Sequence, residues 1–170
     1  MTVARKACHS ARMTTDWLIV DGNNLVHKAP PGLVGSRKRD FPAARWRLAR
    51  KIDELGGQFA PRVTIVFDGS RGGRDAAFES SSVEVVFCPG HVSADEWIEK
   101  AVQRHRDPQQ VLVVTSDRTV RTAVEGSGAF SMSCGRFLDL IAENREDLGE
   151  RLVRQAGAQG PTLGDFFPGD

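Results

Sequence analysis

The chain alternates short apolar runs with longer polar or amphipathic stretches, as expected where strands and helices follow each other in turn. Parallel strands covered on both faces are apolar almost throughout, so runs of Val, Ile, Leu and Phe predict buried strands. Four such runs predict the strands of a central sheet, and a shorter run near residue 130 predicts a fifth. The expected strands lie at residues 17–21, 63–67, 83–87, 111–115 and 129–132.

Apolar residues spaced three or four positions apart predict helices between these strands. The longest is capped by Asp40 or Phe41 and ends at a Gly-Gly pair at residues 56–57. Trp46 is expected on its apolar face, together with Ala49, and therefore in the core instead of serving as a stacking surface. The remaining expected elements are helices at 93–105, where Ser93 to Glu96 form a capping box, at 118–125 and from 137 onward, and polar loops at 23–40 and 69–82.

Strands that alternate with helices predict a three-layer α/β sandwich, with helices on both faces of a mostly parallel sheet of about five strands. The length of 170 residues suits one domain. We expect this domain at residues 16–147. A flexible N-terminal arm is expected at 1–15, and a C-terminal extension or tail that becomes rich in Gly and Pro at 148–170.

The amino-acid composition indicates the cellular compartment in which we expect this domain. The three cysteines are an odd number and widely spaced, which argues against a disulfide framework and favours a reducing compartment. No apolar stretch approaches the length of a membrane span, and the first residues lack the apolar region of a secretory signal. We therefore expect a cytoplasmic protein that has no membrane partner.

Four aspartates stand where an open α/β sheet would present them to a ligand. Asp21, Asp68 and Asp117 follow the first, second and fourth expected strands, and Asp95 opens a helix. Ligands bind beyond the carboxyl ends of the strands in such sheets, so we expect these side chains to converge there. Clustered carboxylates repel one another unless a cation neutralises them. The pattern predicts a Mg²⁺ or Mn²⁺ site suited to phosphate-ester chemistry.

Polar residues flank these aspartates and are candidates for supporting roles. Some have simpler structural explanations. A strand-end Asp can accept bonds from a turn, an Asp that precedes a helix can cap it, and the third helical position of a capping box explains a glutamate. The hydroxyls could also order a metal-bound water or a phosphate. The supporting candidates are Asn23, Asn24, Asp68, Glu96, Thr115 and Ser116.

The net charge is only +1, but one segment of the chain is strongly basic. Between Lys28 and Lys51 there are eight basic residues and one acid. A basic stripe beside an acidic pocket would hold the phosphate backbone of a nucleic acid, although a solvated helix face explains it equally well. The candidates for phosphate contacts are Arg37, Lys38, Arg39, Arg45, Arg71, Arg74 and Arg118.

Together these motifs resemble a known family. The order of Asp21-Gly22-Asn23-Asn24, Phe67-Asp68-Gly69, Ala94-Asp95-Glu96 and Thr115-Ser116-Asp117 resembles the NYN-domain ribonucleases of the YacP-like branch, within the PIN-like nuclease group. The resemblance runs from about Trp17 to Ile141. It implies a PIN-like fold, dependence on Mg²⁺ or Mn²⁺, and endonucleolytic cleavage of single-stranded RNA.

By motif position, the resemblance makes Asp21, Asp95 and Asp117 the catalytic and metal-binding acids. Asn24 corresponds to the polar group after the first acid, and Asp68 to the acid that often ends the second strand. Asn23 departs from the pattern, because many members carry an aromatic residue there.

The expected function is that of a metal-dependent endoribonuclease whose partner is RNA. The ribosome is one possible partner that would present this RNA. The sequence does not indicate the oligomeric state or whether DNA is also a substrate. Two alternatives stand beside it. One is an RNA-binding module without catalysis, and the other is a different Mg²⁺-dependent phosphoryl-transfer enzyme. Against the latter, no Asp-x-Asp pair follows the first strand.

Overall fold

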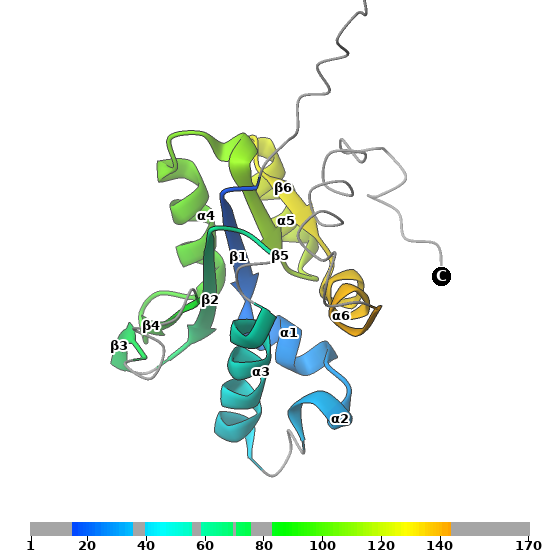
Figure 1. The fold of residues 1–170 in the computed structure, drawn as a ribbon. Coiled ribbons are helices and arrows are strands. Elements are labelled where there is room, and N and C mark those ends of the chain that lie inside the picture. Colours follow the sequence, from blue (N-terminus) through cyan, green and yellow to red (C-terminus); the bar gives the residue numbers. More distant parts are fainter. Residues whose placement is uncertain (1–14, 36–39, 56–58, 70, 76–82, 144–170) are drawn as a thin grey trace, which may run out of the picture.

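The computed structural model describes residues 15–35, 40–55, 59–69, 71–75 and 83–143. These residues form a sheet of six strands in the order β3-β4-β2-β1-β5-β6 (Figure 1). All neighbouring strands are parallel except β3, which is antiparallel to β4. The strands are β1 (Trp17–Asp21), β2 (Arg62–Asp68), β3 (Arg71–Arg74), β4 (Val83–Pro89), β5 (Val111–Val114) and β6 (Phe130–Met132).

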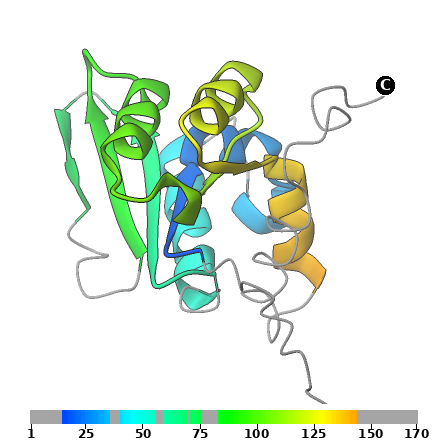
Figure 2. The same ribbon diagram turned by 90° about the horizontal axis from the view of Figure 1, so that it is seen from above.

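Helices cover both faces of this sheet, which confirms the three-layer α/β prediction (Figure 2). Because side chains alternate along a strand, Leu18 and Val20 of β1 enter one core and Ile19 enters the other. The larger core packs under α1, α2, α3 and α6, and the smaller under α4 and α5. The helices are α1 (Gly22–Lys28), α2 (Pro31–Val34), α3 (Phe41–Leu55), α4 (Ala94–Arg104), α5 (Arg118–Gly126) and α6 (Cys134–Glu143).

Two segments expected as loops contain regular structure. The first holds α1 and α2: the Asp21 side chain accepts a hydrogen bond from the Asn24 amide and so caps α1, while Pro31 opens α2. The second holds β3, a short edge strand of sequence RGGR. Its glycines Gly72 and Gly73 have φ values of 69° and 116°. Main-chain pairing with β4 defines this strand, so apolar patterning gives no sign of it.

The expectation for Trp46 is wrong. Its side chain is 49% exposed. The buried face of α3 is formed by Ala44, Leu48 and Ile52, which recur every four residues. Trp46 lies two positions from Ala44 and from Leu48, so the helical period places it on the other side of the helix. The cap predicted at Asp40 is confirmed, because its Oδ1 accepts a 3.0 Å bond from the Ala43 amide.

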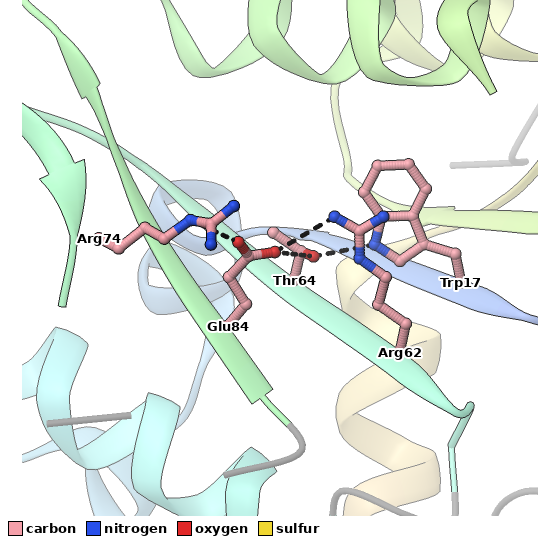
Figure 3. A network of polar contacts seen from close by, with 5 residues as sticks. All are labelled: Trp17, Arg62, Thr64, Arg74 and Glu84. Carbon is pink, nitrogen blue, oxygen red and sulfur yellow. Dashed lines mark hydrogen bonds and ion pairs between the residues drawn. The ribbon is translucent and has the colours of Figure 1, made fainter. Parts of the chain in front are cut away.

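A polar network ties four adjacent strands together at the side of the sheet covered by α4 (Figure 3). The indole Nε1 of Trp17 donates to Thr64 Oγ1 at 2.8 Å, and the Thr64 hydroxyl donates to Glu84 at 3.1 Å. Arg74 and Arg62 pair with the same Glu84 carboxylate at 2.8 and 3.4 Å. The Arg62 guanidinium also lies 3.9 Å from the centre of the Trp17 ring. Burial of the Trp17 indole N–H and the Thr64 hydroxyl is tolerated because each has a partner.

No helix among the described residues is both long and apolar enough to span a lipid bilayer.

Removal of the Thr64 hydroxyl is expected to destabilise the fold. Thr64→Val keeps the side-chain volume but strands the buried Trp17 N–H, at a cost of about 1–3 kcal/mol. The free energy of unfolding in urea measures this loss. In a Trp17→Phe background the same substitution should cost much less, because the stranded donor is gone. Equal costs in the two backgrounds would contradict this account of the network.

Candidate active site

The carboxyl ends of three neighbouring strands meet at one edge of the sheet. β1 lies between β2 and β5, and the chain passes from β1 to β2 on one side and returns to β5 on the other. This reversal of strand order is where open α/β sheets bind ligands. Asp21 ends β1, Asp68 ends β2, and Asp117 comes three residues after β5. The predicted convergence of these strand ends is therefore present.

Asp21 is the most buried of these acids, with 2% of its surface exposed. Its Oδ1 accepts from the Asn24 amide at 3.1 Å, and its Oδ2 accepts from Asn24 Nδ2 and Thr115 Oγ1, each at 3.0 Å. Burial raises the pKa of Asp21 above its ordinary value although these bonds act to lower it, and the Asp68 charge adds to the rise. The carboxylate is thus held in one orientation and shielded from water.

Close packing requires a glycine at position 22, directly after Asp21. A Cβ at this position would lie 2.3 Å from Phe67 Cε1, and Phe67 is a buried core residue. The Asp-Gly-Asn-Asn motif therefore contains a glycine because the start of α1 crosses directly over the Phe67 ring.

Asp68 joins three elements. Its Oδ2 accepts from Asn23 Nδ2 and its Oδ1 from the amide of Ala94, both at 2.7 Å. Asn23 in turn accepts at Oδ1 from Arg45 Nη2 at 3.1 Å. Asn23 thus stands between a carboxylate and a guanidinium, which gives a physical reason for an amide at this position.

Asp117 caps α5, as its structural interpretation predicted. Its Oδ1 accepts from the amides of Thr119 and Val120 at 2.8 and 3.3 Å. Thr115 Oγ1 accepts from the Asp117 amide at 3.1 Å while donating to Asp21, so it connects the two acids. Ser116 Oγ accepts from the Cys134 amide at 3.2 Å. Both hydroxyls therefore have partners within the protein, and their role toward a metal-bound water or phosphate stays a prediction.

Asp95 lies in the first turn of α4, within electrostatic range of the other aspartates. Its pKa is raised to about 6, first by burial and then by the charges of Asp21, Asp117, Asp68 and Glu99. Carboxylates from four separate segments thus act on one another across a common space. Glu99 is an acid that the sequence interpretation missed. Its spacing of four from Asp95 was the available signal, because residues so spaced share a helix face.

Glu96 does not contribute to this cluster of acids. Its side chain is exposed and pairs with Lys100 one turn along α4, and its amide donates to Ser93 Oγ at 3.1 Å. The Ser93 cap predicted for this helix is therefore present, but it uses the Glu96 amide, and the Glu96 carboxylate is explained by its ion pair with Lys100.

The donor set suits a hard divalent cation. In the described part of the chain no group of three or more His, Cys, Asp or Glu side chains is arranged to hold a metal ion as it stands. Mg²⁺, however, commonly keeps several waters and takes only one or two carboxylates directly. Oxygen donors with mutual repulsion fit such a hydrated ion, and they do not fit a closed cage made of protein ligands.

The basic candidates divide into several groups. Arg37, Lys38 and Arg39 lie outside the described residues, as does the side chain of Arg71. Arg74 pairs with Glu84 in the network of Figure 3. Arg118 is exposed directly after Asp117, and Arg45 reaches the cluster of acids through Asn23. The last two are therefore the described basic candidates beside the acids.

Comparison with known proteins agrees with this geometry. A model of the YacP-like NYN domain matches residues 18–166, which extends the likeness beyond Ile141. The crystal structure of Rae1 (YacP) from Bacillus subtilis is 31% identical, with a TM-score of 0.60 over 86% of this chain and 84% of that one. The crystal structure of a mutant of the same Bacillus subtilis protein is 30% identical, with a TM-score of 0.61 over 88% of each chain.

No curated protein matches the chain. The fold, the order of the motifs and the family match nevertheless lead to one assignment, and the predicted resemblance is confirmed. The chain belongs to the family of YacP-like NYN domains, a family of nuclease type.

Proposed function

We propose that this protein is a metal-dependent endoribonuclease that hydrolyses phosphodiester bonds in single-stranded RNA. The observation that carries the proposal is the meeting of Asp21, Asp68 and Asp117 at the ends of strands β1, β2 and β5, with Asp95 within electrostatic range of all three. Membership of a nuclease family supports the reaction class. The arrangement supplies concentrated negative charge at the strand ends.

A divalent ion, Mg²⁺ or Mn²⁺, completes this scheme. Asp21, Asp95 and Asp117 are the residues that would hold it, directly or through water. When bound, such an ion lowers the pKa of water and stabilises negative charge on phosphoryl oxygens. Burial, followed by repulsion from the neighbouring acids, raises the pKa of Asp95, and a cation would offset that repulsion.

The protein's own contribution is positioning. Thr115 and Asn24 fix the Asp21 carboxylate through three hydrogen bonds. The helix cap fixes Asp117 Oδ1. Arg118 opens α5 directly after Asp117 and is exposed, so its charge would attract the phosphate backbone. A reacting phosphate would therefore meet acids of fixed position with a guanidinium beside them.

Asp21→Asn should lower RNA cleavage in Mg²⁺ or Mn²⁺ by at least about 100-fold, because it removes a fixed charge from the centre of the site. Cleavage of a labelled single-stranded RNA measures the effect, and circular dichroism checks the fold. The less buried Asp95→Asn gives a second test. Asp107→Asn is the matched control, since this exposed acid lies before β5 at the opposite end of the sheet; it should cleave normally.

Other outcomes would favour the alternatives. Full activity of Asp21→Asn would remove the central residue from the scheme. RNA binding without cleavage by the unaltered protein in either ion would indicate a binding module. Hydrolysis of a small phosphomonoester with no action on RNA would indicate a different phosphoryl-transfer enzyme.

Asp95 should titrate near its raised pKa of about 6 when no divalent ion is present. Addition of Mg²⁺ should lower this pKa, because a cation favours the charged carboxylate. Since the pKa in the folded protein exceeds the ordinary value of 3.8, the folded state binds the proton more tightly. Acidification from pH 7 through 6 should therefore stabilise the ion-free protein at this residue.

Carbon-13 NMR of the Asp95 carboxyl measures its pKa without a divalent ion and the shift of that pKa on addition of Mg²⁺. Titration at the ordinary value without the ion, or a pKa unmoved by Mg²⁺, would contradict the coupling of Asp95 to the site.

A further inference from the structure

An exposed tryptophan borders a groove beside the cluster of acids. The groove has a volume of about 200 Å³ and lies between α3 and strands β2 and β4. Trp46 and Arg45 line it from the helix, and Phe67 and Phe87 from the strands. Pockets for drug-sized ligands typically hold about 300–1,000 Å³, so this space suits a single planar ring.

The Arg45 guanidinium in this groove is incompletely paired. It lies 4.8 and 5.2 Å from the ring centres of Phe41 and Phe67, and one of its amino groups donates to Asn23. Its Nε is buried and has no hydrogen-bond partner. An unpaired buried polar atom calls for an explanation. A half-buried cation in this condition attracts an anion more strongly than a solvated one.

A chain of contacts connects a residue of the groove to the acids. Arg45 contacts Asn23, Asn23 contacts Asp68, and Phe67 immediately precedes Asp68 in β2. An RNA strand whose phosphate lies at the acids would therefore place a neighbouring nucleotide at the groove.

The basic residues of α3 contact different partners. Arg47 donates to the Val34 carbonyl at 3.2 Å, and Lys51 pairs with Glu54 at 3.0 Å. Arg50 instead lies 5.2 Å from the centre of the Trp46 ring, and Arg45 is on the other side of Trp46 in the sequence. Exposed aromatic rings interleaved with arginines are the usual surface for single-stranded nucleic acid.

We propose that this groove is a base-binding subsite, in which one base of single-stranded RNA, next to the cleaved bond, stacks on Trp46. Arg45 and Arg50 face the flanking phosphates. Asp75 also lines the groove, and its charge favours entry of the base over entry of a phosphate. The subsite rests on the proposed ribonuclease function, because it takes its substrate from that reaction.

Tryptophan fluorescence tests the contact directly. In the Asp21→Asn background, which prevents cleavage, a short mixed-sequence single-stranded RNA should quench the emission. Trp46→Phe should abolish most of this quenching. The matched control is Trp97→Phe, which removes a partly buried indole on the other face of the sheet and should leave the quenching intact. Quenching unchanged by Trp46→Phe would overturn the proposal.

Abasic oligonucleotides locate the stacked base. Loss of one base from the RNA should weaken binding about 5- to 100-fold at a single position, the effect of one base–aromatic stack. In Trp46→Ala, which itself binds more weakly, removal of that base should have no further effect. Arg50→Gln should reduce the slope of log affinity against log salt by about 0.7, one phosphate contact on a single strand.

The outcomes separate the two proposals. If Asp21→Asn is inactive while Trp46→Ala binds every abasic oligonucleotide as the parent does, the subsite is wrong and the ribonuclease function stands. If Asp21→Asn cleaves normally, the catalytic scheme fails whatever Trp46 does. Absence of RNA binding by the parent, or self-association that depends on Trp46 without quenching by RNA, would assign the surface to something else and overturn the subsite.

Discussion

The buried carboxylate of Asp21 is the interaction on which the structure depends. It ends the central strand, and a charge withdrawn from water is tolerated only when it is fully hydrogen-bonded. Its donors come from α1, through Asn24, and from Thr115 after β5, a residue 94 positions away. The same bonds therefore start a helix, join two strands at their carboxyl ends and orient the central acid of the site. Fold and candidate active site share one set of contacts.

Side-chain hydrogen bonds also connect β1 to the strands on one side of it. Trp17, Thr64 and Glu84 connect β1, β2 and β4 by a chain of hydrogen bonds (Figure 3). A site built on strands tied in this way keeps its groups in fixed positions. Against this rigid background the protein retains mutual repulsion around Asp95 and an incompletely paired Arg45. Both are unfavourable for the isolated chain, and under the proposed function both would be relieved by a substrate that brings phosphate together with a cation.

Local signals in the sequence predicted much of this architecture. Apolar runs located all strands except β3, because burial on both faces requires apolar residues throughout. Caps at Asp40 and Ser93 are bonds within a few residues, so their sequence signatures are complete in themselves. The positions of Asp21, Asp68 and Asp117 followed from the rule that parallel strands present their carboxyl ends at one edge. Residue type and spacing sufficed for each of these.

The sequence alone thus determined the order of five strands and four of the helices and the identity of the four aspartates, whereas the tertiary structure decided which side chains meet. The exposure of Trp46 depends on where α3 packs, the bond from Asn23 to Asp68 on how β2 lies against α1, and the strand β3 on an edge that β4 offers. Each is a contact between segments distant in the chain, and its free energy arises only once the sheet has assembled. No local pattern records such a contact, which is why the groove beside the acids could be found only in the folded protein.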